Sequence, residues 1–228
     1  MEQVFDTARV ARNRLRAFRK GQQGADFLLN IVAEELADRL AVVERRFDKA
    51  VELHGVTGVV ASAAQATGKV GEIARIETDA EFAGEGEVLS LAPLELPGLD
   101  DQSLNLVLSP LAAHLINDLP GYFIQIRRAL KPDGLFLAAI PGSGTLSELR
   151  DCLLAAEIEL YGGASPRVIP FADVRDIGGL LQRAGFTLPV VDQETYAVRY
   201  DTLFALMADL RAMGMVNPLL GRSNKPVS

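Results

Sequence analysis

The stretch LNLVLSPLAAHLINDLPGYFIQIRRALKPDGLFLAAIPG, residues 104–142, decides the fold. It begins with an apolar run over residues 104–111 and ends with a second apolar run over residues 134–142. Runs that are apolar at consecutive positions are typical of central strands with helices on both faces. Between them, residues 119–130 have the spacing of an amphipathic helix, and "KPDG" at 131–134 ends it. Strand, crossover helix and strand together predict a doubly wound α/β sheet.

Further short strands and helices extend this unit in both directions. Toward the N-terminus, turn signals separate three predicted strands, at residues 49–55, 71–78 and 86–92. Toward the C-terminus, we expect a sixth strand or hairpin arm over residues 186–200, and helices over residues 143–160, 171–185 and 201–214. This alternation indicates a Rossmann-like, mostly parallel sheet.

Two helices are predicted before the first strand. The first has a stripe of apolar residues, with arginines around the rest of its surface; the stripe is Val4, Ala8, Ala11, Leu15 and Phe18, and the arginines are Arg9, Arg12, Arg16 and Arg19. A membrane or nucleic-acid role competes with a docked helix whose arginines face solvent, and the docked helix is favoured. The second helix runs over residues 26–47 with Asp26 as its N-cap. We therefore divide the chain into an N-terminal helical segment packed on the core (1–48), an α/β domain (49–213) and an untethered tail (214–228).

Composition excludes several classes of function. The 228 residues carry a net charge of -7, which argues against a general nucleic-acid binder. Two histidines and one cysteine cannot form a His/Cys metal cluster, so no metal is expected. The single cysteine, Cys152, lies in an apolar helical pattern and is expected to be buried. No segment approaches the ~20 apolar residues that span a bilayer, so a cytoplasmic protein is expected.

Several segments together resemble one known family. They are "HLINDLPGYFIQIRRALKPDGLFLAAIPG" (114–142), "GTLSELR" (144–150), "AAEIELYGGASPRVIPFADVRDIGGLLQRAGFTLPVVD" (155–192) and the opening "VFD…RVARNR". They resemble the class I S-adenosylmethionine-dependent methyltransferase-like family that includes the mitochondrial complex I assembly factor acting on an NADH dehydrogenase subunit. More distantly, they are similar to the malonyl-carrier-protein O-methyltransferase of biotin synthesis. The resemblance implies a seven-stranded sheet with S-adenosylmethionine across the carboxyl ends of strands one, two and four, in agreement with the general position of ligands in such sheets.

The resemblance also implies a cofactor loop after the first strand. Glu52 matches the family's first acid and Gly58 its last loop glycine, whereas His54 and Val56 flank Gly55 where the family has glycines. Glycine adopts positive φ freely and leaves room for a ligand, but a β-branched Val does neither. We therefore expect strain of at least ~1 kcal/mol per residue and a degenerate motif.

Two further cofactor positions are carried over from the family. Glu77 matches the acid that binds the ribose hydroxyls, and both of its oxygens could accept hydrogen bonds. Leu91 stands where an acid would contact the adenine, with Ser90 beside it. The predicted cofactor-binding set is therefore Glu52, His54, Gly55, Gly58, Glu77 and Ser90.

Other candidate residues have two interpretations each. His114 matches a family histidine near the cofactor and is the candidate catalytic residue; alternatively, it starts a helix, is satisfied by local hydrogen bonds, and Asn117 or Asp118 is the cap. Arg167 and Arg175 lie in a predicted loop over the active-site mouth and could bind a substrate carboxylate. Ion pairs with Asp173 or Asp176 are the alternative, and we favour them.

Competing functions reduce to two. A dehydrogenase lacks G-x-G-x-x-G and a hydrolase lacks G-x-S-x-G in this sequence. An S-adenosylmethionine-dependent enzyme acting on a protein or a small carboxylate therefore competes with a noncatalytic member that binds proteins. The family's closing strand is missing before Ser228, so we expect a gap or an exposed edge beside strand five, which favours covering by a helix or pairing with another chain, in a homodimer or with a partner.

Overall fold

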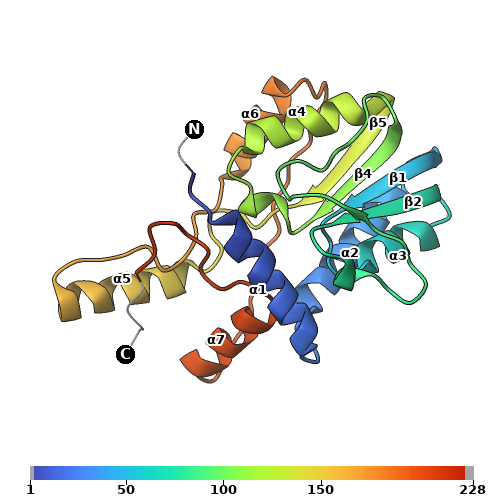
Figure 1. Ribbon diagram of the computed structural model, residues 1–228. Coiled ribbons are helices and arrows are strands. Elements are labelled where there is room, and N and C mark those ends of the chain that lie inside the picture. The colour runs from blue at the N-terminus through green and yellow to red at the C-terminus, as the bar shows by residue number, and fades with distance from the viewer. Residues whose placement is uncertain (1–2, 224–228) are drawn as a thin grey trace.

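The computed structural model of the protein describes residues 3–223. Helices cover both faces of one parallel sheet (Figure 1). The helices are α1 (Thr7–Lys20), α2 (Phe27–Ala41), α3 (Val59–Ala66), α4 (Leu119–Ala129), α5 (Ser147–Tyr161), α6 (Val174–Arg183) and α7 (Leu203–Ala212), with short 3-10 helices η1 (Ala80–Phe82) and η2 (Ala113–Leu115). The strands are β1 (Phe47–Leu53), β2 (Val70–Glu77), β3 (Ser90–Leu91), β4 (Leu104–Pro110) and β5 (Leu130–Ala139).

The strand order β3-β2-β1-β4-β5 makes the sheet doubly wound. Every pairing is parallel, and β1 and β4 lie at the centre. The chain reverses its direction of sheet growth between β1 and β4, and such reversals leave a crevice at the carboxyl ends of the strands. The predicted Rossmann-like fold class is therefore confirmed.

Strand β4 shows why the apolar runs predicted a central strand. Leu106 and Leu108 belong to the core that contains α2 and α3, whereas Val107 faces the opposite core with α4. All three side chains are fully buried. Successive residues of a strand point to opposite faces, so burial on both faces requires apolar residues at every position.

Strand β5 begins earlier than the sequence predicts. Leu104 pairs with Leu130, after which the register breaks and resumes with Leu106 opposite Leu135. The intervening "KPDG" turn has Asp133 at φ 60°, so it forms an irregularity inside the strand instead of separating helix from strand.

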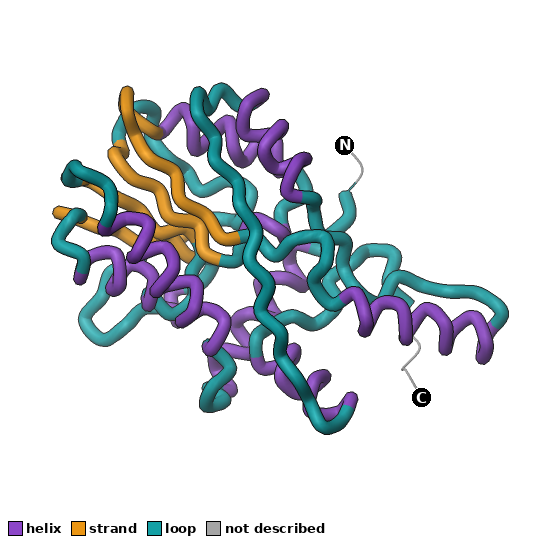
Figure 2. The backbone as a smooth tube through the Cα atoms, turned by 180° about the vertical axis from the view of Figure 1, so that it is seen from behind, coloured by secondary structure: helices purple, strands orange, loops and turns teal. Residues whose placement is uncertain are grey.

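The predicted sixth strand over residues 186–200 is wrong. This segment contains no strand in the described part of the chain, and Figure 2 shows a long loop crossing the face of the molecule. Leu188 and Val190 are 89% and 87% exposed, so no neighbouring strand covers the apolar alternation that suggested a strand. The sheet therefore has five strands among residues 3–223 instead of seven, and β5 is an edge.

The N-terminal helices differ from their predicted faces and bounds. The buried side chains of α1 are Val10, Asn13 and Arg14, so the predicted apolar stripe is wrong in part: Leu15 and Phe18 are half-buried, and the Phe18 ring packs against Phe82, but Val4 and Ala8 are exposed. The face rotates because α1 packs beside α7 and Asn13 donates a hydrogen bond to the Val216 carbonyl oxygen at 2.8 Å. Helix α2 ends at Ala41 instead of residue 47, because Phe47 already pairs with β2. The proposed domain boundaries at 48/49 and 213/214 stay predictions.

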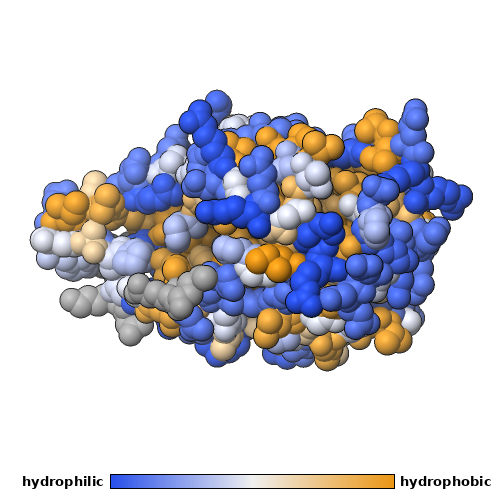
Figure 3. All heavy atoms as spheres, turned by 90° about the horizontal axis from the view of Figure 1, so that it is seen from above, coloured by the Kyte–Doolittle hydropathy of each residue, from blue (hydrophilic) through white to orange (hydrophobic). Residues whose placement is uncertain are grey.

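Helix α5 extends away from the sheet as an arm (Figure 1). Cys152, on this arm, is exposed, so the prediction of a buried thiol is wrong. Figure 3 shows apolar side chains on the surface at this end of the molecule, where Ile158 and Leu160 are 55% and 62% exposed. The helical periodicity was correct, but among residues 3–223 no second layer covers the apolar face of α5.

The expected untethered tail is also wrong for its described part. The Leu220 N–H donates to the Val4 carbonyl oxygen at 2.9 Å, and the Asp6 N–H donates to the Pro218 carbonyl oxygen at 2.9 Å. Leu219 is 4% exposed in the core. Residues 224–228, the rest of the predicted tail, lie outside the described residues. Among residues 3–223, no helix is both long and apolar enough to cross a bilayer.

Candidate functional site

The loop after β1 keeps the positive-φ backbone that glycine favours, even at the two positions where His54 and Val56 replace the family's glycines. His54 and Val56 have φ of 57° and 68°, and Gly58 has φ of 70°. Left-handed conformations are unfavourable for residues with a Cβ, and most of all for β-branched ones. The expected strain is therefore present at both substituted positions.

Side chains from β2 and α1 hold this loop in place. The Val56 N–H donates to Glu77 Oε1 at 2.6 Å, and the Val56 carbonyl oxygen accepts from Arg75 Nη2 at 2.9 Å. The His54 carbonyl oxygen accepts from Arg14 Nη2. These bonds to charged groups compensate for the strained backbone.

Arg75 joins the predicted acids into one buried network. Its guanidinium lies 3.2 Å from Glu52 Oε1, 3.2 Å from Glu77 Oε1 and 2.6 Å from Glu87 Oε2. Glu52 Oε2 also accepts from the Ala61 N–H at 2.5 Å, at the start of α3. Burial raises the pKa of Glu52 to about 7, although Arg75 opposes the shift. Glu52 thus anchors α3 and Arg75 beneath the loop.

Glu77 has one engaged and one unengaged oxygen. Oε1 accepts from the Val56 N–H and Arg75, whereas the buried Oε2 has no hydrogen-bond partner among the described residues. Burial raises the pKa of this carboxyl, and Arg14 opposes the shift. Oε1 is therefore engaged inside the protein, and the role of Glu77 toward ribose hydroxyls stays a prediction.

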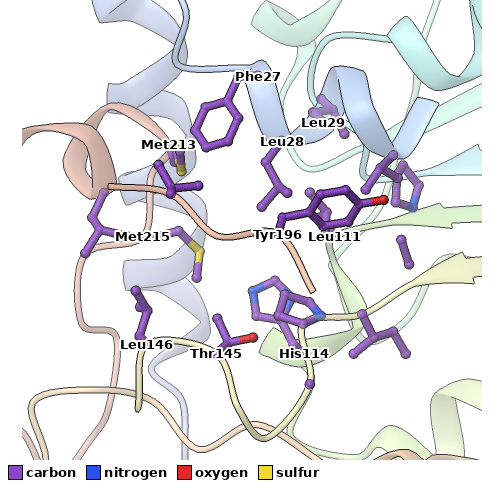
Figure 4. Close-up of a pocket in the computed structure, with 18 of the residues that line it drawn as sticks. Phe27, Leu28, Leu29, Leu111, His114, Thr145, Leu146, Tyr196, Met213 and Met215 are labelled. Atoms are coloured by element: carbon purple, nitrogen blue, oxygen red, sulfur yellow. The ribbon is translucent and has the colours of Figure 1, made fainter. Parts of the chain in front are cut away.

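A cavity of about 1640 Å³ lies at the carboxyl ends of β1, β4 and β5. Its walls come from α1, α2, α7, the loop residues 55–57 and the segment 190–200. Figure 4 shows Tyr196 from that segment projecting between Leu28 of α2 and His114. Drug-sized ligands commonly occupy roughly 300–1,000 Å³, so this space admits a ligand together with part of a second molecule.

His114 lies in this cavity wall. It is 8% exposed, and neither ring nitrogen has a hydrogen-bond partner among the described residues. Burial, with a smaller effect from the Arg14 charge, lowers the pKa of His114 to about 3. Asp118 does cap α4 by accepting from the Gly121 N–H at 3.0 Å, as one interpretation expected. The local hydrogen bonds that this interpretation gave His114 are absent, so that part of it is wrong.

His54, by contrast, is buried outside the cavity wall. Its ring is 0% exposed, and burial followed by the Arg14 charge lowers its pKa to about 3. The Pro93 backbone weakly opposes this shift, but neither ring nitrogen makes a hydrogen bond of normal geometry. The side chain therefore occupies a neutral buried position under the loop.

The other predicted cofactor residues are scattered. Gly55 lines the cavity, and a Cβ there would clash with Glu52 Oε1. A Cβ at Gly58 would lie 2.9 Å from the Arg75 guanidinium, outside the cavity wall. Ser90 is exposed on β3 opposite Ile76. Of the predicted cofactor and catalytic residues, only Gly55 and His114 line the cavity.

The two predicted substrate arginines also lie outside the cavity wall. Arg167 Nε donates to Glu157 Oε1 at 2.7 Å, so the ion-pair interpretation holds for Arg167 with a partner other than Asp173 or Asp176. Arg175 is exposed on α6, and its backbone N–H donates to the capping Asp173 carboxylate at 2.9 Å. Their role toward a substrate stays a prediction.

Sequence reasoning missed Arg14 and Arg75. Arg75 precedes Glu77 by two residues, and the strand period of two places both on one face. Arg14 belongs to the set Val10, Asn13, Arg14 and Ala17, whose i, i+3, i+4, i+7 spacing marks one face of a helix. Among residues 3–223, no group of three His, Cys, Asp or Glu side chains is arranged to hold a metal ion.

Comparisons with known proteins agree with this geometry. Residues 40–138 match the family described as "Methyltransferase domain". The mitochondrial arginine-hydroxylase NDUFAF5 of Homo sapiens is 38% identical over 197 residues, covering 84% of this chain and 57% of that protein. The NDUFAF5 of Dictyostelium discoideum is 49% identical over 130 residues, covering 57% of this chain and 30% of that protein. The chain therefore spans at most little more than half the length of these relatives.

More distant matches extend the comparison. The malonyl-[acyl-carrier protein] O-methyltransferase of Gallionella capsiferriformans is 35% identical over 141 residues, covering 62% of this chain and 47% of that protein. The structure of an S-adenosylmethionine dependent methyltransferase from Mesorhizobium loti is 17% identical, with a TM-score of 0.52 over 82% of this chain and 94% of that one. The matched domain, the relatives and the parallel sheet confirm the resemblance of this chain to the class I S-adenosylmethionine-dependent methyltransferase-like family.

Proposed function

We propose that this chain binds S-adenosylmethionine in the cavity and acts as a methyltransferase-like enzyme with a degenerate first cofactor motif. One observation carries the proposal: the cavity lies where the sheet reverses direction, between the loop residues 55–57 and His114. Ligands of open α/β sheets bind at this position. The loop also retains the positive-φ backbone that the family's glycines provide.

The residues present fit this ligand in part. His114 lines the cavity, and its neutral ring can donate or accept a hydrogen bond, whereas Glu77, the family's ribose acid, lies outside the cavity wall with its buried Oε2 unpaired among the described residues. The adenine acid is replaced by Leu91, which is 58% exposed, so that contact is lost. When bound, S-adenosylmethionine supplies an electrophilic methyl group. The chain's own contribution is to hold the ligand and exclude water with the 190–200 segment.

The substrate that we propose is a protein side chain or a small carboxylate. The named relatives act on these two kinds of group, an arginine and a malonyl-carrier protein. The cavity has room for such a group beside a cofactor, since its volume is about 1640 Å³. A cytoplasmic location stays a prediction.

A second candidate function is noncatalytic protein binding, for example in the assembly of respiratory complex I. The observation that favours it is the Glu77–Val56–Arg75 contact, which engages the ribose acid inside the protein. Glu52, His54, Gly58 and Ser90 also lie outside the cavity wall, as a site that has lost its cofactor would show.

Calorimetric titration with S-adenosylmethionine and S-adenosylhomocysteine separates the two candidates. The enzyme proposal expects micromolar dissociation constants for the unchanged chain. The double variant His54→Gly/Val56→Gly, which restores the family's glycines, is the matched comparison. Heat from the double variant alone would show that the natural loop blocks the site, and no heat from either at millimolar ligand would favour the noncatalytic candidate.

A further inference from the structure

Helix α5, the arm of Figure 1, exposes its apolar side chains and buries a charged one. Leu154, Ile158 and Tyr161 are 46%, 55% and 51% exposed, whereas the buried side chain of the helix is that of Glu157. Among residues 3–223, no α5 side chain belongs to either hydrophobic core. A helix of a folded protein normally shows the reverse arrangement, with its apolar stripe toward the core.

The contacts of Glu157 fix the orientation of this helix. Its carboxylate accepts from the Ser165 N–H at 2.7 Å and from Arg167 Nε at 2.7 Å, in the segment that follows α5. These bonds turn the Glu157 side of the helix toward that segment. Leu154 and Ile158, which are four residues apart and share one row, therefore face solvent.

A helix without packing on its apolar side is marginally stable in water. α5 has 15 residues, and most of the stability of helices of this length comes from tertiary packing of an apolar face. Contiguous apolar side chains on a surface with a polar border mark interaction sites. The lack of packing within residues 3–223 therefore indicates that another molecule covers the row of Leu154 and Ile158.

The charges beside the apolar row indicate the chemistry of that molecule. Asp151 and Glu159 are eight residues apart and lie on one side of the row of Leu154 and Ile158. Both acids are exposed, and neither has an ion-pair partner among the described residues. Arg150, the one basic residue of α5, lies on the opposite side of the row. A partner with an apolar stripe and basic side chains beside it complements both features.

The two acids disfavour other occupants of this face. In an antiparallel two-fold pairing of two α5 helices about Ala155, Asp151 of one copy would approach Glu159 of the other, and like charges would repel. A membrane surface is disfavoured because acidic lipid headgroups repel the same carboxylates. The net charge of -7 also opposes acidic partners of any kind.

We propose that the exposed face of α5, formed by Leu154, Ile158, Asp151 and Glu159, docks a basic amphipathic helix of another protein. Partner helices are recognised through apolar anchors with i and i+4 spacing. With a rise of about 1.5 Å per residue, α5 offers a contact of about 22 Å. The inference goes beyond the proposed function, because Leu154 and Ile158 lie outside the cavity wall, which α5 reaches only with residues 147–149.

Fluorescence anisotropy with two synthetic helical peptides tests the apolar row. One peptide has Leu at i, i+3, i+4 and i+7 positions and Lys elsewhere, and the other has Glu in place of Lys. The Leu/Lys peptide should bind at micromolar concentration, and the Leu/Glu peptide roughly ten-fold more weakly or worse. Leu154→Ser/Ile158→Ser should weaken the Leu/Lys peptide by roughly ten-fold or more, because two apolar anchors are lost. Val42→Ser/Val88→Ser, at two exposed apolar positions outside α5, is the matched control and should leave this affinity unchanged.

A second pair of variants tests the acidic side of the face. Asp151→Asn/Glu159→Gln should weaken the Leu/Lys peptide by roughly three- to ten-fold at low ionic strength and make its binding less dependent on salt. Glu34→Gln/Asp38→Asn removes two exposed carboxylates from α2 and gives the same net charge, so it is the matched control. It should change the affinity by less than about two-fold.

Defined outcomes would overturn this docking face. These are the absence of Leu/Lys peptide binding at millimolar concentration, and binding that the α5 variants leave unchanged. A dimer mass in light scattering that Leu154→Ser/Ile158→Ser abolishes would assign the face to a second copy instead, and binding to phosphatidylcholine vesicles that this variant loses would assign it to a membrane. A lowered unfolding midpoint of this variant with unchanged peptide binding would show that the row packs within the chain. Failure to bind S-adenosylhomocysteine alongside normal peptide binding would contradict the proposed function and support the docking face.

Discussion

At the scale of single residues, the positive φ of Val56 stores strain that a substitution can release. Val56→Gly removes the Cβ that disfavours φ of 68°, whereas Val56→Ala keeps it. Both variants lose the part-buried isopropyl group, so their difference isolates the backbone. We expect the Gly variant to be more stable than the Ala variant by about 1 kcal/mol in urea unfolding. Equal stabilities would show that the loop is unstrained at this position.

Glu52 should make stability depend on pH. Burial raises its folded-state pKa to about 7 from the ordinary 4.5, so the folded chain binds this proton more tightly than the unfolded chain. The contribution of Glu52 is therefore present below pH 4.5 and is lost as the pH rises through about 7. Glu52→Gln keeps the acceptor for Ala61 and removes the titration.

Urea unfolding of both proteins at two pH values tests this sign. The stability of the unchanged chain relative to Glu52→Gln should fall by about 2 kcal/mol between pH 5.5 and pH 7.5. His54 and His114, whose pKa values are lowered to about 3, favour the folded state as pH rises toward 6.5. Their effect is common to both proteins and cancels in the difference. A difference that is constant with pH would contradict the raised pKa.

At the scale of elements, Asp118 begins the helix that follows the cavity loop. Its carboxylate accepts from the Gly121 N–H at 3.0 Å at the start of α4. Asp118→Ala should lower the free energy of unfolding by about 1 kcal/mol, while Asp118→Asn, which retains a capping oxygen, should lose only part of this. Chemical denaturation measures both. Equal losses in the two variants would assign the effect to charge instead of capping.

Elements that are buried on both faces could be predicted from the sequence, and those that depend on docking could not. Leu106, Val107 and Leu108 are apolar because each faces a core, so the run itself carried the signal for β4. Leu188 and Val190 alternate along the chain as strand residues do, yet both are largely exposed and no strand among the described residues covers them. Periodicity reports which residues avoid water locally and does not report whether a partner strand exists.

The residues of the candidate site likewise divide into those that the sequence could predict and those that depend on tertiary docking. The family resemblance pointed to the acids Glu52 and Glu77, and the structure brings both to the loop. Both acids are held inside the protein by Arg75. The strand period of two, which places Arg75 and Glu77 on one face of β2, could have predicted the contact of Arg75 with Glu77. The placement of Arg14 depends on how α1 docks against the His54 carbonyl, a tertiary contact that leaves only a weak helical pattern in the sequence.

At the scale of the whole molecule, the sheet ends at an unprotected strand. Among the described residues, β5 pairs only with β4, and the segment 186–200 does not extend the sheet. Unpaired N–H and C=O groups along an edge are a template for another chain. We therefore expect a homodimer, or a partner protein, to add to this edge.

Hydrogen exchange and light scattering at several protein concentrations test the homodimer. In a homodimer through this edge, the outward amides of residues 135–139 should exchange more slowly as concentration rises, since pairing buries them. The amides of β1, which lies between β2 and β4, form the internal control and should exchange at one rate throughout. The scattering mass should double over the same range. A constant monomer mass, together with exchange in β5 that does not depend on concentration, would contradict the homodimer, because an unpaired edge strand should favour self-association at high concentration. The partner at this edge would then have to be a different protein.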